Sequence, residues 1–242
     1  MAENNPEDIK RAVLSRYSQH AQRRLAALQE MGASSCCSAP QEAVDAASCS
    51  CCDESDPLAD ANVAEALYSA EDLRDLPEDV LTSLGCGNPT AIAGLNEGES
   101  VLDLGSGGGL DCFLSAQKVG PKGDVVGLDM SADMVQLARR NAGRIGAENV
   151  RFRLGEMEDM PFAADSFDVI ISNCVINLSP DKDAVFREAL RVLKPGGRLR
   201  ASDIVFAREP TEQERSDLVS WTACIAGALT EADYASKLRA SG

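Results

Sequence analysis

Five short apolar segments recur through the middle of the chain and alternate with stretches that space their apolar residues as helices do. The segments are residues 100–105, 124–130, 150–155, 167–173 and 197–205. Each is a nearly continuous apolar run, as expected for a strand whose two faces are both covered. Strands that alternate with helices are typical of a parallel sheet. The pattern therefore predicts an α/β fold, with a mostly parallel sheet and helices on both faces.

The region before this core divides into a helix and a segment without a regular pattern. Residues 7–31 place apolar and long side chains on one helical face, which carries Val13, Tyr17, His20, Arg24 and Leu28. Residues 33–57 are small, polar and rich in cysteine without a clear period, which is typical of a loop. One or two short helices are expected between this loop and the core.

Charge and hydropathy exclude several classes of partner. The 242 residues carry a formal net charge of −16, so the surface is expected to repel nucleic acid and anionic membranes. No apolar run approaches the roughly 20 residues that a membrane-spanning helix needs, and the polar start MAENNPEDIKR has no signal-peptide core. We therefore expect a cytoplasmic protein that binds neither nucleic acid nor membrane.

The ends of the first two strands indicate a nucleotide-type cofactor. The stretch LDLGSGGGLD joins the first strand to a helix, and its glycines let a ligand approach backbone N–H groups closely. Asp129 ends the second strand about 20 residues beyond Gly109, where a carboxylate can accept both ribose hydroxyls. Gly105, Gly107 and Gly109 follow a G-x-G-x-G spacing, which differs from the dinucleotide fingerprint.

Nine cysteines and a single histidine direct attention to thiol chemistry. Stable disulfides are rare in a reducing compartment, where thiols more often bind metals or react. Cys174 lies at the end of a predicted strand, which is where α/β domains hold their ligands. Cys112 follows the glycine loop on a helix and is expected to be a small buried residue that matters for stability. His20 is expected to be an ordinary surface residue.

Several motifs resemble those of known methyltransferases. GEMEDMPF and VLKPGGRL resemble class I S-adenosylmethionine-dependent methyltransferases, whose fold is Rossmann-like. In combination, LGCGNP, LDLGSGGGLD, SNCVINLSPDK and WTACIAGAL resemble arsenite methyltransferases over about residues 67–235. The resemblance implies S-adenosylmethionine as cofactor. The implied cofactor contacts are Asp103, Gly105, Gly107 and Gly109 at the amino-acid part, Asp129 and Met130 at the ribose and adenine, Glu156 and Met157 at the adenine edge, and Asn173.

The same resemblance implies that three cysteines hold trivalent arsenic and are the catalytic residues, namely Cys86, Cys174 and Cys224. Thiolates suit this substrate because arsenic(III) is a soft centre that carboxylate or imidazole would not select. The implied substrate is arsenite or methylarsenite, and the implied role is arsenic detoxification. Auxiliary thiols are expected in the cysteine-rich segment, at Cys49, Cys51 and Cys52 with Cys36 and Cys37 nearby. Reducing thiols such as glutathione or thioredoxin are expected to reset the enzyme.

This resemblance also implies a division into three parts. Residues 1–66 would form an N-terminal helix with the cysteine-rich, arsenic-handling segment, and residues 67–206 the methyltransferase core. Residues 207–242 would form a C-terminal helical, arsenic-binding segment. Class I methyltransferase sheets have seven strands, whereas this chain stops where the last two would begin, so those edge strands are expected to be missing and the C-terminal segment truncated.

Two other functions remain open on the sequence. A methyltransferase acting on a quinone-like small molecule would carry the same glycine loop and adenine motif. Alternatively, the chain could be a non-catalytic, thiol-rich protein that binds a metalloid or zinc, since C-x-C-C at residues 49–52 offers zinc-binding atoms without the paired C-x₂-C spacing. Substitution of Cys174 tests the first alternative, because methylation of a quinone-like acceptor does not need this thiol. Absence of S-adenosylmethionine binding would indicate the second alternative.

Overall fold

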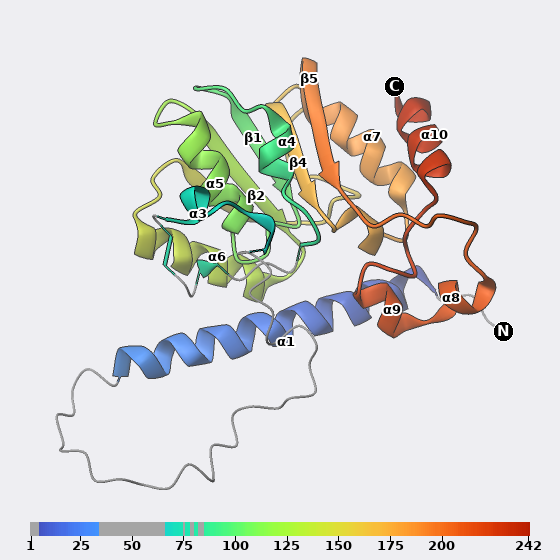
Figure 1. Ribbon diagram of the computed structural model, residues 1–242, viewed down its shortest axis with the longest axis horizontal. Helices are drawn as coiled ribbons and strands as arrows, with labels where there is room; N and C mark the ends of the chain where they lie inside the picture. The colour runs from blue at the N-terminus through green and yellow to red at the C-terminus, as the bar shows by residue number, and fades with distance from the viewer. Residues whose placement is uncertain (1–4, 34–65, 75, 78–79, 82–84) are drawn as a thin grey trace, which may run out of the picture.

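A five-stranded parallel sheet forms the centre of the protein, with strand order β3-β2-β1-β4-β5 and helices on both faces (Figure 1). The computed structural model describes residues 5–33, 66–74, 76–77, 80–81 and 85–242. The strands are β1 (Ser100–Leu104), β2 (Asp124–Asp129), β3 (Val150–Leu154), β4 (Phe167–Asn173) and β5 (Leu193–Ser202). The predicted α/β fold class is confirmed.

The predicted bounds are right to within a residue for the first four strands and wrong for the fifth. β5 begins at Leu193, which pairs with Phe167 before an irregularity in the register, and it ends at Ser202. Ile204 and Val205 look like strand residues in the sequence, but they lie beyond the end of β4 and are 37% and 46% exposed. A strand ends where its partner ends, because its backbone groups then lack hydrogen-bonding partners.

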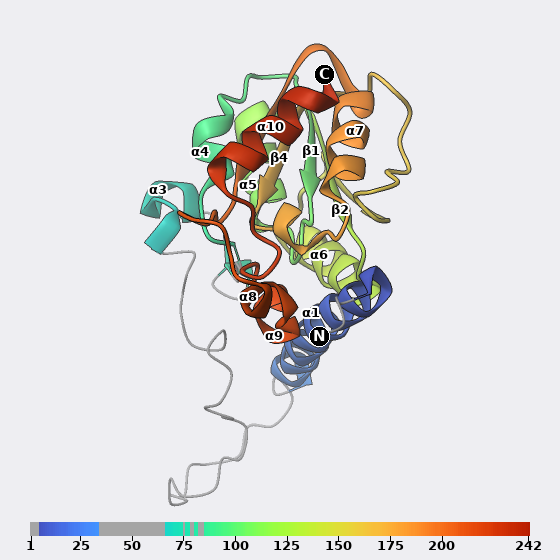
Figure 2. The same ribbon diagram turned by 90° about the vertical axis from the view of Figure 1, so that its right-hand side faces the viewer.

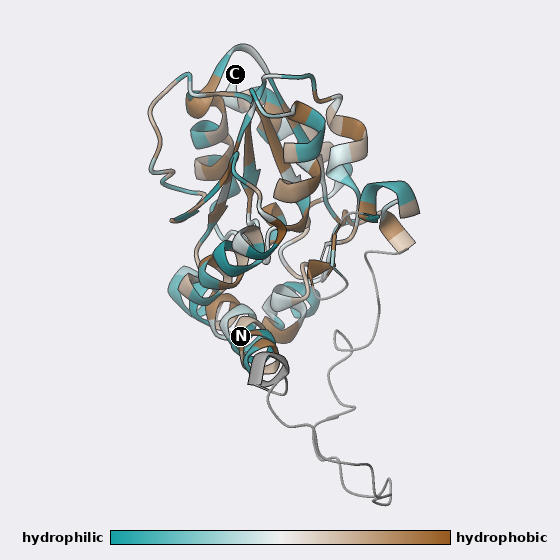
Figure 3. Ribbon diagram, turned by 90° about the vertical axis from the view of Figure 1, so that its left-hand side faces the viewer, coloured by the Kyte–Doolittle hydropathy of each residue, from teal (hydrophilic) through white to brown (hydrophobic). Residues whose placement is uncertain are grey.

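Helices cover each face of the sheet with a separate apolar cluster. α4 (Pro89–Ala93), α5 (Leu110–Val119) and α6 (Ala132–Ile145) pack on one face, around the fully buried ring of Phe113. α7 (Lys182–Val192) lies on the other face, and α10 (Glu231–Ser241) packs beside it (Figure 2). Phe186 of α7 contacts Tyr234 of α10 edge to face. Hydrophobic positions concentrate on the strands and on inward helix faces (Figure 3). Burial on both sides explains the continuous apolar runs of the strands.

A long helix, α1 (Pro6–Ala33), crosses the molecule beyond the carboxyl ends of the strands (Figure 1). It confirms the helix predicted over residues 7–31, and Val13 and Leu28 on its shared face are buried. Its polar side chains bond to both sides of the core: Gln22 donates to Asp133 at the start of α6 (3.0 Å), and Arg16 donates to Thr222 (2.9 Å). α1 therefore spans the edge of the sheet where parallel α/β domains hold ligands.

The chain after β5 returns to this same edge. It forms α8 (Glu212–Ser216) and α9 (Leu218–Thr222), and α9 packs against α1 and against the short 3₁₀ helix η3 (Ile176–Leu178). The short helix α3 (Ala70–Leu73) precedes the core, as expected. None of the described helices combines the length and apolar character required to cross a membrane. The boundary predicted at residue 66 adjoins residues outside the described part of the chain and stays a prediction.

Candidate active site

A cavity opens at the carboxyl ends of β1, β2 and β4, beneath α1. Its walls come from the glycine loop at residues 105–108, the end of β2 at 129–131, the turn at 155–158 and the exit of β4 at 173–175. Side chains of α1 line the remaining side. Six residues predicted to contact a cofactor lie in these walls besides Asn173: Gly105, Gly107, Asp129, Met130, Glu156 and Met157.

The glycine loop owes its shape to backbone conformations that other residues rarely adopt. Gly105 and Gly107 have φ angles of 65° and 51°. A Cβ atom at Gly105 would lie 2.2 Å from Val175, the residue after Cys174. Asp129 secures the loop, because its Oδ2 accepts a hydrogen bond from the Gly107 N–H (2.9 Å) and its Oδ1 accepts one from the Ser131 N–H (2.8 Å). The loop and the β4 exit thus fit closely only with glycine at position 105.

The cavity suits a polar, cationic ligand such as S-adenosylmethionine. Burial raises the pKa of Asp129, and it raises the pKa of Asp111, another lining residue, to about 6. A nearby positive charge would stabilise both carboxylates in the ionised form. Ser106 Oγ and Asn141 Oδ1 are buried without a hydrogen-bond partner among the described residues, and both residues line the cavity. Buried polar atoms normally have partners, which a polar ligand would supply.

Two residues predicted to contact the cofactor, Asp103 and Gly109, are not among the lining residues. Asp103 is buried in the middle of the sheet, where the Cys112 thiol donates to its Oδ2 (3.2 Å). Gly109 is the N-cap residue just before α5, and a Cβ there would lie 2.8 Å from the rings of Phe113 and Phe152. The structure therefore gives these two residues packing contacts beneath the loop, and their cofactor contact remains a prediction.

The sequence did not indicate that α1 forms part of the site. Tyr17 and His20 line the cavity, so the expectation that His20 is an ordinary surface residue is wrong. Lys10 forms an ion pair with Glu156 and lies 3.5 Å from Glu158, in the turn predicted to meet adenine. Amphipathic spacing showed that one face of α1 is covered, but periodicity cannot show which part of the chain covers it.

Asn173 fixes the Cys86 loop to the end of β4. Its Oδ1 accepts hydrogen bonds from the backbone N–H groups of Cys86 and Gly87, both at 3.1 Å. Its Nδ2 donates to Asp111 Oδ2 (3.1 Å) and to the Tyr68 hydroxyl (3.0 Å). Asn173 was predicted as a cofactor contact, and although it lines the cavity, its amide already bonds to protein groups. Asp111 was not predicted from the sequence, but it lines the cavity, whereas Asp103 does not.

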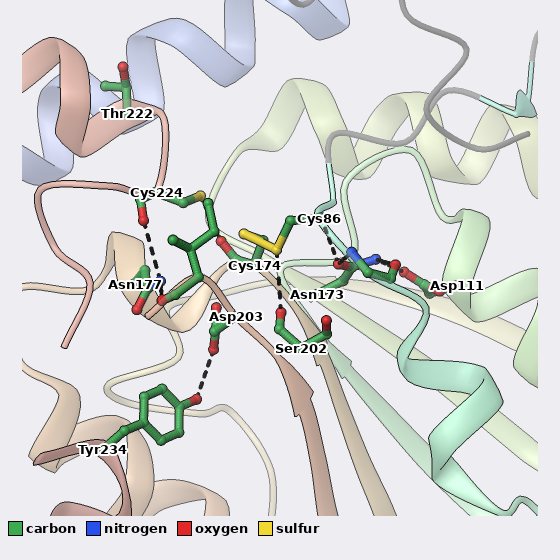
Figure 4. Close-up of a disulfide and its surroundings, with 12 residues drawn as sticks. Cys86, Asp111, Asn173, Cys174, Asn177, Ser202, Asp203, Thr222, Cys224 and Tyr234 are labelled. Atoms are coloured by element: carbon green, nitrogen blue, oxygen red, sulfur yellow. Dashed lines mark hydrogen bonds between the residues drawn. A yellow bond between two sulfur atoms is a disulfide. The ribbon is translucent and has the colours of Figure 1, made fainter. Parts of the chain in front are cut away.

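The three cysteines predicted to bind arsenic converge beside this cavity from segments far apart in the chain (Figure 4). Cys86 and Cys174 form a disulfide, with their Cα atoms 5.8 Å apart. The Cys224 thiol donates to the backbone oxygen of Cys174 (2.7 Å). In this structure the three cysteines are present as one disulfide and one thiol, and the Asn173 hydrogen bonds hold Cys86 directly against Cys174. Binding of arsenic by all three as thiolates stays a prediction.

Backbone conformation distinguishes two of these cysteines from ordinary core residues. Cys174 and Cys224 both have a φ angle of 62°, in the left-handed region that side chains other than glycine rarely adopt. The Cys174 N–H donates to the Ser202 oxygen at the end of β5 (2.7 Å), which supports this turn. Such strain costs about 1–3 kcal/mol per residue and concentrates at functional sites. The strained turns favour a functional role over simple packing.

The Cys224 thiol is buried in apolar surroundings. It is 5% exposed and packs with Val13 and Leu178. Burial raises the pKa of Cys224 to about 11, although a hydrogen bond with the Tyr17 hydroxyl acts to lower it. The thiol is therefore protonated near neutral pH. It must release this proton in order to bind a soft ion as a thiolate.

The auxiliary thiols proposed from the sequence, Cys49, Cys51 and Cys52, lie outside the described residues, as do Cys36 and Cys37. Within the described part, no group of three histidine, cysteine or acidic residues is arranged to hold a metal ion. A zinc site at C-x-C-C is therefore not tested.

Comparison with known proteins identifies the family. A family model described as a methyltransferase domain matches residues 95–242, which is more than half of the chain. The chain belongs to this methyltransferase family. The matched residues of the methyltransferase domain include the glycine loop, Asp129, Cys174 and Cys224.

Curated relatives and a solved structure narrow the comparison. The methyltransferase is 41% identical to an arsenite methyltransferase of Halobacterium salinarum, over 100% of this chain and 59% of that protein. It is 46% identical to one from Aquipseudomonas alcaligenes, over 69% of this chain and 49% of that protein. An arsenic(III) S-adenosylmethionine methyltransferase from Chlamydomonas reinhardtii superposes with a TM-score of 0.65 at 41% identity, covering 71% of this chain and 60% of that one. The chain thus spans between half and three fifths of their lengths.

Replacement of Asp129 by alanine is expected to weaken S-adenosylmethionine binding by about 1–3 kcal/mol, the scale of losing a charged hydrogen-bonding partner. It is expected to leave arsenite binding nearly unchanged. Calorimetric titration of each ligand measures both effects. Asp124→Ala, at the opposite end of β2, is the matched control because its carboxylate pairs with the exposed Arg151 (2.5 Å) and is not among the residues that line the cavity. Cofactor affinity equal to wild type in Asp129→Ala would remove Asp129 from the site.

Replacement of Cys112 by alanine is expected to lower the free energy of unfolding by about 1–3 kcal/mol, because the buried Asp103 carboxyl loses its hydrogen-bond donor. Cys112 is fully buried, as predicted from its place in the sequence. Denaturant unfolding measures the loss of stability, and a turnover assay below the unfolding range should show near wild-type methyl transfer. A variant with normal stability but no activity would contradict the packing role.

Proposed function

We propose that the protein transfers a methyl group from S-adenosylmethionine to trivalent arsenic bound by the thiolates of Cys86, Cys174 and Cys224. The observation that carries the proposal is the convergence of these three cysteines, from the start of the core, the exit of β4 and the turn after α9, beside the glycine-loop cavity. The similarity to arsenite methyltransferases supports the same substrate.

The walls of the cavity would bind and orient the cofactor. Asp129, Met130, Glu156 and Met157 would hold the nucleoside, and the glycine loop would approach the amino-acid part. S-adenosylmethionine supplies an electrophilic methyl group when it is bound. α1 covers the cavity with Lys10 and Tyr17 and so limits access of water to the site.

The cysteines would bind the substrate without a general base. Arsenous acid exchanges each of its hydroxyl groups for a thiolate, and the thiol proton leaves with the hydroxide as water. This exchange accounts for binding by buried, protonated thiols such as Cys224, and it needs no histidine. When three sulfurs bind arsenic, its lone pair points away from them. The orientation of the three sulfurs therefore decides whether the lone pair points at the methyl group. Alignment of the reacting groups is the main contribution of the protein.

Thiol reductants are a second part of the proposal. Methylation leaves arsenic formally pentavalent, so return to the trivalent state requires two electrons, which two thiols supply when they join as a disulfide. Cys86 and Cys174 are adjacent and form such a bond in this structure. Exchange with a small thiol or with a dithiol protein such as thioredoxin would then restore both thiols.

The decisive experiment is incubation of the reduced protein with arsenite, S-adenosylmethionine and a thiol, followed by chromatographic separation of the arsenic species. Methylated arsenic is the expected product. A quinone-like acceptor should be assayed in parallel, because methylation of that acceptor with none of arsenite would favour the alternative. Binding of arsenite without any binding of S-adenosylmethionine would indicate a non-catalytic thiol protein.

A further inference from the structure

The second half of the motif SNCVINLSPDK contains a buried amide that the proposed chemistry does not use. Asn177 lies on η3, three residues after Cys174, and is 0% exposed. Its Nδ2 donates to the backbone oxygen of Ile204 (2.7 Å) and to that of Cys224 (3.3 Å) (Figure 4). One side chain thus connects the Cys174 turn with the segment after β5 and with the turn that carries Cys224.

The backbone oxygen of Asn177 also has close neighbours, namely Lys182 and Gly227. Lys182, only 8% exposed, donates from its Nζ to the backbone oxygens of Asn177 (3.4 Å) and Ser179 (2.9 Å). Its ammonium lies 5.3 Å from the centre of the Trp221 ring, within the range of a cation–π contact. A Cβ on Gly227 would lie 2.0 Å from the Asn177 oxygen, so the Cys224 turn packs directly on this backbone.

The Cys224 turn is held by its own backbone hydrogen bonds, such as that from the Cys224 N–H to the Trp221 oxygen (3.0 Å), and by its contact with α1. Asn177 adds a side-chain bond from the Cys174 side. Helix α9 before it has five residues, which is too short to be stable by itself. Val219 and Ile225 on either side of the turn are 70% and 42% exposed, whereas Cys224 and Ala226 are buried, so only part of the turn is packed in apolar surroundings. Cys224 itself is in the left-handed conformation, which persists only where surrounding contacts enforce it.

The choice of asparagine also points to hydrogen bonding rather than packing. Asn177 Oδ1 is buried without a hydrogen-bond partner among the described residues. An unpaired buried oxygen is unfavourable, and an apolar residue of the same size would avoid it. Aspartate and leucine would lack these donors, and serine would offer a single O–H donor. Asparagine fits because its amide donates two hydrogen bonds, one to each carbonyl.

We propose that Asn177 is a positioning residue, which holds the Cys224 thiol at a fixed distance and direction from Cys174 by bonding to the Cys224 carbonyl. The inference rests on the proposed function. Its consequence for that function is that arsenic is bound by three sulfurs rather than two. Asn177 does not contact the arsenic. Lys182 acts one step further away by fixing the Asn177 main chain.

The test uses the full chain in reduced form and the substitution Asn177→Leu, which keeps the number and branching of the side-chain heavy atoms and removes both donors. Iodoacetamide labelling of Cys224, followed by peptide mass spectrometry, is expected to be about tenfold faster than in wild type because the turn opens locally more often. Labelling of Cys112, in the same samples, should not change. Asn149→Leu is the matched control, because the Asn149 amide also donates to a backbone carbonyl, that of Gly120 (3.0 Å), far from the site.

Two readouts separate positioning from plain stability. X-ray absorption of bound arsenite is expected to show loss of one of the sulfur neighbours in Asn177→Leu but not in Asn149→Leu. The kcat for arsenite methylation should fall at least tenfold, which corresponds to about 1.4 kcal/mol, while the affinity for S-adenosylmethionine stays that of wild type. If Asn177→Leu and Asn149→Leu lose activity only in proportion to their unfolding free energies, positioning is overturned.

A second variant protects the test against a folding failure. Gly227→Ala pushes a methyl group against the Asn177 oxygen and the Trp221 ring, and it should speed Cys224 labelling in the same way. Wild-type labelling of Cys224 in whichever of the two variants folds would overturn the proposal. The labelling experiment contains neither arsenic nor cofactor. A wild-type chain that fails to methylate arsenite would thus refute the proposed function and leave the labelling result standing.

Discussion

Cys224→Ser is expected to abolish arsenite methylation while S-adenosylmethionine still binds with near wild-type affinity, and Cys174→Ser is expected to do the same. Serine keeps the size of the side chain but offers a hard, protonated oxygen in place of a soft thiolate. With one ligand lost, arsenic is bound more weakly and its lone pair points elsewhere, and in-line transfer is sensitive to small errors in orientation. Chromatography of arsenic species and calorimetric titration of the cofactor measure the two effects.

Single serine substitutions in the cysteine-rich segment serve as controls, at Cys36, Cys37, Cys49, Cys51 and Cys52. Their effects should be milder, because neighbouring thiols can replace one another in exchange reactions. Methylation of arsenite at the wild-type rate by either Cys174→Ser or Cys224→Ser would show that three thiolates are not needed. The quinone-type alternative would then become the stronger hypothesis.

The oxidised chain is expected to bind no arsenite at the site until a thiol reductant is added, and then to regain binding fully. The Cys86–Cys174 disulfide removes two of the three proposed ligands and leaves Cys224 as the remaining thiol. One thiolate cannot supply three sulfur ligands, so the loss should be nearly complete. Arsenite binding, measured before and after treatment with a dithiol, tests this expectation, and cofactor binding should be the same in both states.

Cys86→Ser provides the control for the redox prediction. This variant cannot form the Cys86–Cys174 bond, so mild oxidation should no longer protect Cys174 from alkylation. In wild type, oxidation should protect Cys86 and Cys174 together, since they share one bond. Equal arsenite binding by the oxidised and reduced wild-type chain would show that this disulfide does not control the site.

The sheet and the cofactor loop could be predicted from local patterns. Strand runs such as FDVIISN are apolar throughout because both faces of the sheet are covered, so their positions follow from hydropathy alone. Asp129 and the glycines were found from spacing, because a loop between a strand and a helix has few possible geometries. The start of β5 at Leu193 was missed, since its pairing with Phe167 depends on an irregular register that no local pattern records.

The sequence by itself predicted the number of strands, the loop with Asp129, and the thiol-bearing motifs around Cys86, Cys174 and Cys224. Each of these features depends on residues that are close together in the chain. Which groups meet was decided only by tertiary structure. α1 lies over the cavity, Asn173 brings Cys86 against Cys174, and Asn177 holds the Cys224 turn 47 residues further along. These contacts join distant segments through hydrogen bonds of single side chains, and a hydrogen bond between distant residues leaves no periodic pattern in a sequence.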